Sequence, residues 1–290
     1  MPLNDILTLH PLTFMIAAML VGLLIGSFLN VVVWRLPKML VREWREEARD
    51  VLGLPSETPL PTFNLLLPHS QCPHCGHRIR AWENIPLLSY LFLRGRCSNC
   101  TAAISKRYPL TELACGLLSA FIAWHFGFGW QACMALLLSW GLLTMSLIDA
   151  EYQLLPDVLV LPLIWLGLIV NSFGLFVSLH EALWGAVAGY MALWSVFWLF
   201  KLITGKDGMG HGDFKLLAMF GAWGGWQILP LTILLSSMVG AVVGVILLRL
   251  RNAKTSTPIP FGPFLAIAGW IALLWGGQIT DFYWQFVGLK

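Results

Sequence analysis

Long runs of apolar residues alternate with short charged segments along most of the chain. A hydrocarbon core of about 30 Å is crossed by roughly 17–25 apolar residues in a helix. Runs close to this length predict about eight membrane-spanning helices, over Phe14–Val33, Leu113–Gly127, Ala132–Ile148, Val158–Val177, Ala182–Ile203, Leu216–Leu229, Leu231–Leu250 and Phe261–Trp275. The pattern therefore indicates an α-helical polytopic membrane protein.

The composition supports a lipid environment. Apolar residues make up 58% of the 290 residues and charged residues 11%, against roughly 45–50% and 25% in soluble domains. The mean hydropathy of +0.74 excludes a disordered chain. A formal net charge of +3 gives no support to nucleic-acid binding.

Basic residues are concentrated in alternate loops. Residues 34–110, 149–156, 201–215 and 249–259 contain 17 of the 18 lysines and arginines. The positive-inside rule places these loops in the cytoplasm, and both termini then lie outside. We therefore expect a multi-pass membrane protein with its basic loops in the cytoplasm. We also expect three parts: a first span within residues 1–33, a cytoplasmic insert over 34–110, and a multi-span domain over 111–290.

The insert contains two Cys-x-x-Cys motifs, Cys72-Pro-His-Cys75 and Cys97-Ser-Asn-Cys100. Two such motifs at this spacing are typical of a four-thiolate zinc site. A reducing cytoplasm argues against disulfides, although a redox pair remains an alternative, as do His74 and His77 as ligands. Because four cysteines leave no open coordination position, we expect the zinc to be structural.

Two aspartates stand where predicted spans meet the cytoplasm. Asp149 ends the third span, and Asp213 opens the sixth within Gly210-His-Gly212-Asp213. A facing carboxylate pair that shares one proton can act as base toward water and acid toward a carbonyl, as peptide hydrolysis requires. The glycines would let the backbone approach a substrate closely. The alternatives are a solvated or capping role for the aspartates, or a proton or ion pathway.

Five motifs in order resemble one known family. They are Gly26-Ser-Phe-Leu-Asn30, the doubled Cys-x-x-Cys, the segment Asp149–Asp157, Gly210–Asp213, and Pro260-Phe-Gly-Pro263. Over nearly its whole length the chain resembles the bacterial type IV prepilin peptidases, or prepilin leader peptidase/N-methyltransferases. Their active-site motif is similar to that of the GxGD intramembrane aspartyl proteases.

The resemblance implies a bifunctional enzyme. It would remove the leader of type IV prepilins and type II secretion pseudopilins on the cytoplasmic side, after a glycine and before a phenylalanine. It would then methylate the new amino terminus with S-adenosylmethionine. Asp149 and Asp213 match the catalytic pair, Gly210 and Gly212 the supporting motif, and Asp157 a structural aspartate. Cys72, Cys75, Cys97 and Cys100 match the zinc ligands. No GxGxxG fingerprint marks a cofactor site, so the residues that bind S-adenosylmethionine stay unassigned, and a peptidase without methylation remains an alternative.

Overall fold

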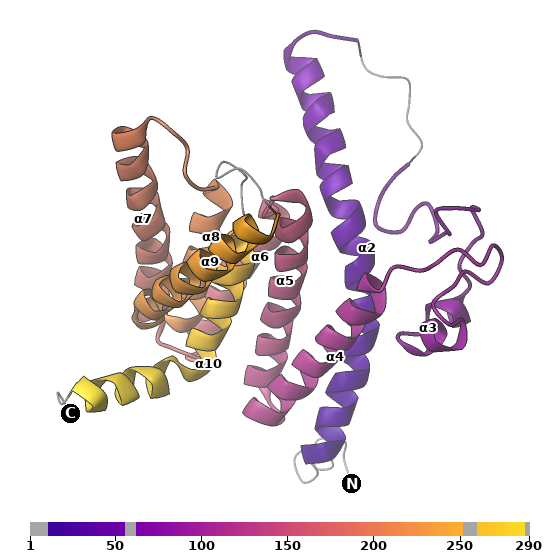
Figure 1. The fold of residues 1–290 in the computed structure, drawn as a ribbon. Coiled ribbons are helices and arrows are strands. Elements are labelled where there is room, and N and C mark those ends of the chain that lie inside the picture. Colours follow the sequence, from indigo (N-terminus) through magenta and orange to yellow (C-terminus); the bar gives the residue numbers. More distant parts are fainter. Residues whose placement is uncertain (1–10, 56–61, 252–259, 288–290) are drawn as a thin grey trace. The chain divides into compact units, whose positions relative to one another are not determined.

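The computed structural model describes residues 11–55, 62–251 and 260–287. The regular elements of these residues are helices: α2 (Pro11–Val51), η1 (Ala81–Asn84), α3 (Leu88–Phe92), α4 (Arg107–Phe126), α5 (Trp130–Tyr152), α6 (Asp157–Ser172), α7 (Leu179–Thr204), α8 (His211–Gly224), η2 (Trp226–Ile228), α9 (Leu229–Arg251) and α10 (Gly262–Val287) (Figure 1). The chain forms two compact units, residues 1–140 and 141–290.

The first unit is built on the pairing of α2 with α4. Gly22 and Gly26, four residues apart on α2, face α4 so closely that an added Cβ would lie 2.3 Å from Oγ of Ser119 and 2.8 Å from Cα of Glu112. Small residues at this spacing let two helix backbones approach within a membrane. Buried Asn30 adds a hydrogen bond from its side-chain amide to the carbonyl oxygen of Tyr108, at 3.2 Å.

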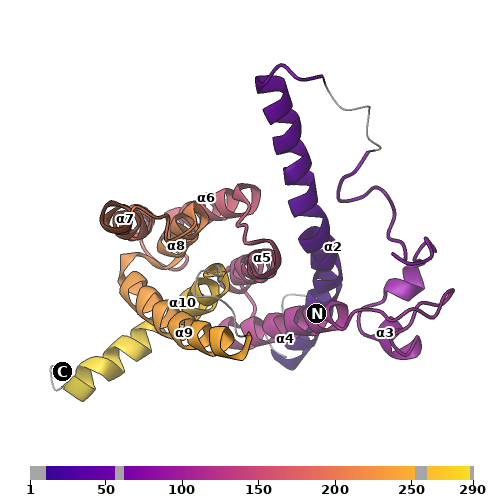
Figure 2. The same ribbon diagram turned by 45° about the horizontal axis from the view of Figure 1, so that its top comes forward.

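The second unit is organised around α8. Every residue of α8 from Asp213 to Gly224 is buried except Lys215, as expected for a helix that is apolar on all sides. The helices α6, α7, α9 and α10 pack against it, and Figure 2 shows α8 beside α6 and α7. This packing places the first turn of α8, which carries Asp213, inside the unit.

The closest approach in the second unit joins α7 and α8. A Cβ at Gly221 would lie 2.1 Å from the carbonyl oxygen of Gly185, and one at Gly189 would lie 2.7 Å from the carbonyl oxygen of Leu217. The start of α7 is secured by a capping box in which Ser178 and Glu181 exchange hydrogen bonds with each other's backbone. Glycines therefore set the distance between these helices, and the cap sets where α7 begins.

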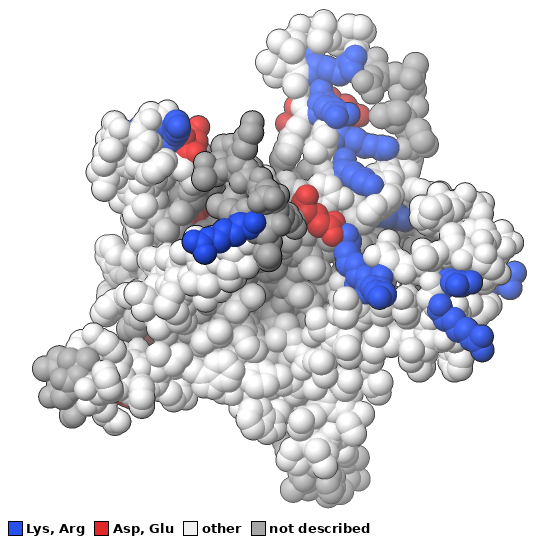
Figure 3. Space-filling view, in the orientation of Figure 1, with Lys and Arg blue, Asp and Glu red and all other residues white. Residues whose placement is uncertain are grey.

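Each of the eight predicted spans overlaps one of these helices. Six of the described helices are long and apolar enough to cross a membrane, which fits a multi-pass membrane protein. The helices α6 and α8, with 16 and 14 residues, fall below that length. In Figure 3 large areas of the visible face carry no charge, and many basic side chains gather along α2.

Two predicted boundaries were wrong. The predicted span Val158–Val177 ends at Ser172, because the side-chain oxygen of buried Asn171 accepts the N–H groups of Phe176 and Val177 and turns the chain. The predicted span Leu216–Leu229 instead runs from His211 to Gly224. It ends there because Gly225 adopts a φ of 75°, a left-handed conformation that glycine reaches without strain.

Two further helices are longer than the predicted spans. The first span was predicted to end at Val33, but α2 continues to Val51. The last was predicted to end at Trp275, but α10 continues to Val287. Hydropathy reports where apolar residues stop, and a helix can continue beyond that point into polar sequence.

Candidate functional site

Asp149 lies in the last turns of α5 with its carboxyl group buried; the residue is 6% exposed. Its Oδ2 accepts a hydrogen bond from the backbone N–H of Gly262, at 3.0 Å. Gly262 is the first residue of α10, where the N–H groups have no partner within the helix and carry partial positive charge. The carboxyl group of Asp149 is thus held by the amino-terminal end of another helix.

Asp213 lies in the first turn of α8 and is 7% exposed. Its carboxyl group interacts electrostatically with that of Asp149 and also contacts the backbone of Gly210. The two acids that the sequence singles out are therefore brought together within the second unit. Two carboxyl groups that interact in this way are suited to hold a single proton between them.

The two glycines before Asp213 meet different neighbours. Gly210 is the N-cap of α8, and a Cβ there would lie 3.8 Å from Oδ2 of Asp213. A Cβ at Gly212 would lie 2.7 Å from Cβ of Leu155. Gly212 therefore allows the segment between α5 and α6 to pass close to the first turn of α8.

Asp157 does not join the pair. It stands in the first turn of α6 and accepts two hydrogen bonds, each 2.7 Å long, from the ammonium group of Lys215. Its side chain is 54% exposed. This ion pair links α6 to α8 two residues beyond Asp213, which fits the structural role expected for Asp157.

Gly262 is the contact that sequence reasoning missed. The segment Pro260-Phe-Gly-Pro263 is visible as a motif, but nothing in it names a partner. A glycine beside a proline at the start of an apolar run is a readable signal for a helix start with close backbone approach. The partner, Asp149, lies 113 residues earlier in the chain.

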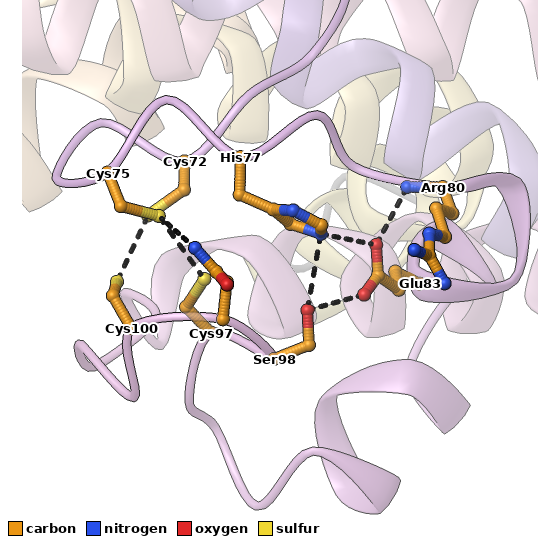
Figure 4. Close-up of polar contacts among 9 residues, drawn as sticks. Cys72, Cys75, His77, Arg80, Glu83, Cys97, Ser98 and Cys100 are labelled. Atoms are coloured by element: carbon orange, nitrogen blue, oxygen red, sulfur yellow. Dashed lines mark hydrogen bonds and ion pairs between the residues drawn. The ribbon is translucent and has the colours of Figure 1, made fainter.

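The four cysteines of the insert form a compact cluster that could hold a metal ion (Figure 4). Their sulfur atoms all lie within 4.8 Å of one another. The Sγ atoms of Cys72 and Cys100 are 3.7 Å apart, and those of Cys75 and Cys97 are 4.0 Å apart. A tetrahedral ion with four bonds of about 2.3 Å to sulfur requires sulfur separations of about 3.8 Å. The cysteines therefore fit zinc.

The two cysteine motifs adopt the same backbone turn. Residues Gln71 and Arg78 form an isolated β-bridge around the first, and Arg96 and Ala103 form one around the second. In each turn the N–H of the first cysteine donates to a carbonyl five residues later, at 2.9 Å. The residue after the second cysteine has a positive φ, 70° at Gly76 and 57° at Thr101.

Backbone and side-chain donors surround the sulfur atoms. The backbone of His77 and the side-chain amide of Asn99 lower the pKa of the Cys75 thiol to about 7. The backbone N–H groups of Cys100 and Asn99 lower the pKa of Cys97. A thiolate is the form that binds metal, so these donors favour the metal-binding form of Cys75 and Cys97.

A polar network joins the two cysteine turns (Figure 4). Glu83 accepts hydrogen bonds from the N–H of Arg80, at 2.8 Å, and from the hydroxyl of Ser98, at 2.5 Å. These donors, first the Arg80 N–H, hold the pKa of Glu83 below its ordinary value. The ring of His77 lies 3.4 Å from the same carboxylate. His77 therefore braces the site through Glu83, and the four-sulfur set is complete without it.

Comparison with known proteins identifies both halves of the chain. Residues 20–126 match the bacterial peptidase A24 N-terminal domain, and residues 136–245 match the type IV leader peptidase family. Proteins named prepilin leader peptidase/N-methyltransferase are similar over essentially the full length. The one from Pseudomonas aeruginosa is 72% identical over 100% of both chains, and the one from Stutzerimonas stutzeri is 69% identical over 98% of this chain and 99% of its own.

More distant relatives carry the same name. The protein from Xanthomonas campestris pv. campestris is 50% identical over 97% of this chain and 98% of its own. No solved structure matches significantly. On the evidence of both domain matches and of full-length identities up to 72%, the chain belongs to the type IV leader peptidase family.

Proposed function

We propose that this protein is a bifunctional membrane enzyme that cleaves the leader from type IV prepilins and type II secretion pseudopilins, and then N-methylates the new amino terminus. The full-length identity to proteins named prepilin leader peptidase/N-methyltransferase supports both activities. The observation that carries the peptidase half is that Asp149 and Asp213 are both buried in the second unit and that their carboxyl groups interact electrostatically.

In the proposed cleavage, the oxygen of a water molecule attacks the carbonyl carbon of the scissile peptide. Its proton passes to the ionised carboxylate of the pair, and the protonated carboxyl group donates to the carbonyl oxygen. Collapse of the tetrahedral intermediate breaks the C–N bond. The leaving nitrogen takes the proton from the carboxyl group that accepted it from water. One hydroxyl proton of the intermediate then passes to the other carboxylate, which restores the starting state of the pair.

Gly210 and Gly212 would support this chemistry through the backbone. Gly210 caps the helix that presents Asp213, and Gly212 lets the neighbouring loop approach. A glycine before the scissile bond of the substrate would likewise let its backbone reach the acids. Substrates with a bulky residue at that position should therefore be cleaved poorly.

We further propose that the eight helices that match the predicted spans are embedded in the bacterial inner membrane, with the aspartate pair facing the cytoplasm. The distribution of lysine and arginine among the loops supports this orientation. The shortness of α8 is compatible with it, since a helix enclosed by protein need not present a full hydrophobic length to lipid.

The insert, residues 34–110, would hold a structural zinc ion on Cys72, Cys75, Cys97 and Cys100 and contribute to methylation. The sulfur separations support zinc. S-adenosylmethionine is the proposed methyl donor, and no residue is assigned to it. The spans over residues 111–290 would then form the peptidase.

The test is an assay of purified protein in detergent with a recombinant prepilin and labelled S-adenosylmethionine. We expect Asp149→Asn and Asp213→Asn each to lower cleavage by about 10²–10⁴-fold, the range typical of a general acid or base. Asp157→Asn is the matched control, because its exposed side chain lies on the same unit, and it should cleave within a few-fold of wild type. Normal cleavage by both pair variants would refute the proposal. Methylation of an already cut pilin by these variants would show that the second activity uses other residues.

A further inference from the structure

The amino-terminal residue of α10 makes a contact that its own helix does not require. The carbonyl oxygen of Phe261 accepts the N–H groups of Phe264 and Leu265, each at 3.1 Å, so Phe261 caps the helix. Gly262 is then the first helical residue, and its N–H has no acceptor within the helix. It donates instead to Oδ2 of Asp149 in a buried hydrogen bond.

The same residue leaves space for the carboxyl group. A Cβ at Gly262 would lie 2.6 Å from Oδ2 of Asp149 and 3.1 Å from its Cγ. Real Cβ atoms essentially never approach a neighbour that closely, so any other residue here would displace the carboxyl group. A hydrogen bond to a carboxylate is short-ranged and directional, so the displacement would also break the bond.

Pro263, the next residue, leaves the N–H of Gly262 as the donor at this point of the helix. Pro263 has no N–H and its fixed φ suits the first turn of a helix. The Gly262 N–H is therefore not followed by a second donor at the next residue. With Oδ2 occupied, the remaining oxygen, Oδ1, is left for other partners.

We propose that Gly262 is a positioning residue for peptide cleavage, which fixes the carboxyl group of Asp149 by donating to Oδ2 and by leaving room for it, so that Oδ1 receives the proton of the attacking water. This inference rests on the proposed role of Asp149 and Asp213. It assigns a function to Pro260-Phe-Gly-Pro263 in preparing one acid of the pair. Gly262 itself would not touch the substrate.

Two variants test separately the room that Gly262 leaves for the carboxyl group of Asp149 and the hydrogen bond that its N–H donates. Gly262→Ala keeps the N–H but fills the space, and replacement of Gly262 by glycolate, which turns its amide into an ester, removes the N–H without adding an atom. We expect the alanine variant to lower kcat for cleavage by about 100-fold, the usual effect of a misplacement of about 1 Å. The ester should lower it by about 10-fold, as expected for loss of one hydrogen bond to a charged group. KM should change by less than about 3-fold in both, because the contact is with Asp149.

Gly277→Ala is the matched control, since it lies on the same helix and a Cβ there has nothing within 4 Å. Thermal unfolding of each variant in detergent reports whether the second unit is folded. Wild-type kcat in both Gly262 variants, alongside an inactive Asp149→Asn, would overturn this inference and leave the proposed function intact. If the alanine variant also unfolds at a lower temperature, the ester decides: reduced kcat with a normal unfolding temperature supports the proposal, and unchanged kcat refutes the role of the donor.

Discussion

The cysteine cluster and the aspartate pair are assembled in opposite ways. The outermost cysteines of the cluster are 28 residues apart, and both halves use the same short backbone turn. The aspartate site draws on three helices, and its hydrogen bond from Gly262 to Asp149 joins residues 113 apart. One site is local in the sequence, and the other exists only after the helices of the second unit have packed.

The two regions also differ in what stabilises them. Among described residues 62–106, the buried apolar side chains are those of Cys72, Pro86 and Cys97. In the second unit, α8 is buried along nearly its whole length, with Trp223, Phe214 and Phe220 among the largest fully buried side chains. A segment with so little apolar burial would depend on a bound metal and on its hydrogen bonds, whereas the second unit depends on helix packing. This difference predicts that the two regions can be disrupted separately.

The largest expected effect is loss of the metal from the insert. Structural zinc contributes on the order of 10 kcal/mol to folding at neutral pH, so a strong chelator, or the double variant Cys72→Ser/Cys97→Ser, should unfold the insert. Limited proteolysis should then cut within residues 62–106 while the spans stay intact, and methylation should fall far more than cleavage. Cys133→Ser is the control, because Cys133 lies on α5 outside the cluster. Unchanged proteolysis after metal removal would contradict a structural metal.

A smaller effect is expected from filling the contact between α7 and α8. Gly221→Ala would place its Cβ 2.1 Å from the carbonyl oxygen of Gly185, and this oxygen belongs to the backbone of a helix, which cannot yield locally. We expect a loss of about 1–3 kcal/mol in the stability of the second unit, measured by thermal unfolding in detergent. The zinc content should stay unchanged. Gly277→Ala, in open space, should leave the unfolding temperature where it is or raise it. Equal unfolding temperatures for Gly221→Ala and Gly277→Ala would show that α7 and α8 are not in tight contact at Gly221.

The smallest effect concerns the two cysteine turns themselves. Thr101 occupies with φ 57° the position that Gly76 occupies with φ 70°, and a left-handed conformation costs a residue with a Cβ about 1–2 kcal/mol. Thr101→Gly should therefore stabilise the insert by about 1 kcal/mol, and Gly76→Thr should destabilise it by a similar amount. The rate of zinc release to a competing chelator would measure both. If Thr101→Gly and Gly76→Thr changed the rate of zinc release in the same direction, the two turns would not be equivalent.

Much of the architecture follows from the sequence because it depends on short-range properties. Apolar runs predicted a helix at each of eight places, and the doubled cysteine motif predicted a compact four-sulfur cluster. Both succeed because hydropathy over one helix and the geometry of a tight turn are set by neighbouring residues. The positions of Asp149 at the end of one helix and of Asp213 at the start of another were visible in the same way.

Tertiary structure decided the remainder. Hydropathy cannot distinguish a helix that faces lipid from one enclosed by protein, so it did not anticipate that α8 would be short, enclosed along nearly its whole length, and end at Gly224. It could not place the end of α6 either, because the turn there depends on hydrogen bonds to the side chain of Asn171. The contact of Gly262 with Asp149 could not be predicted from the sequence either, because it too depends on tertiary packing. Which backbone N–H meets a buried carboxyl group is settled only when distant helices pack, and no local pattern records the partner.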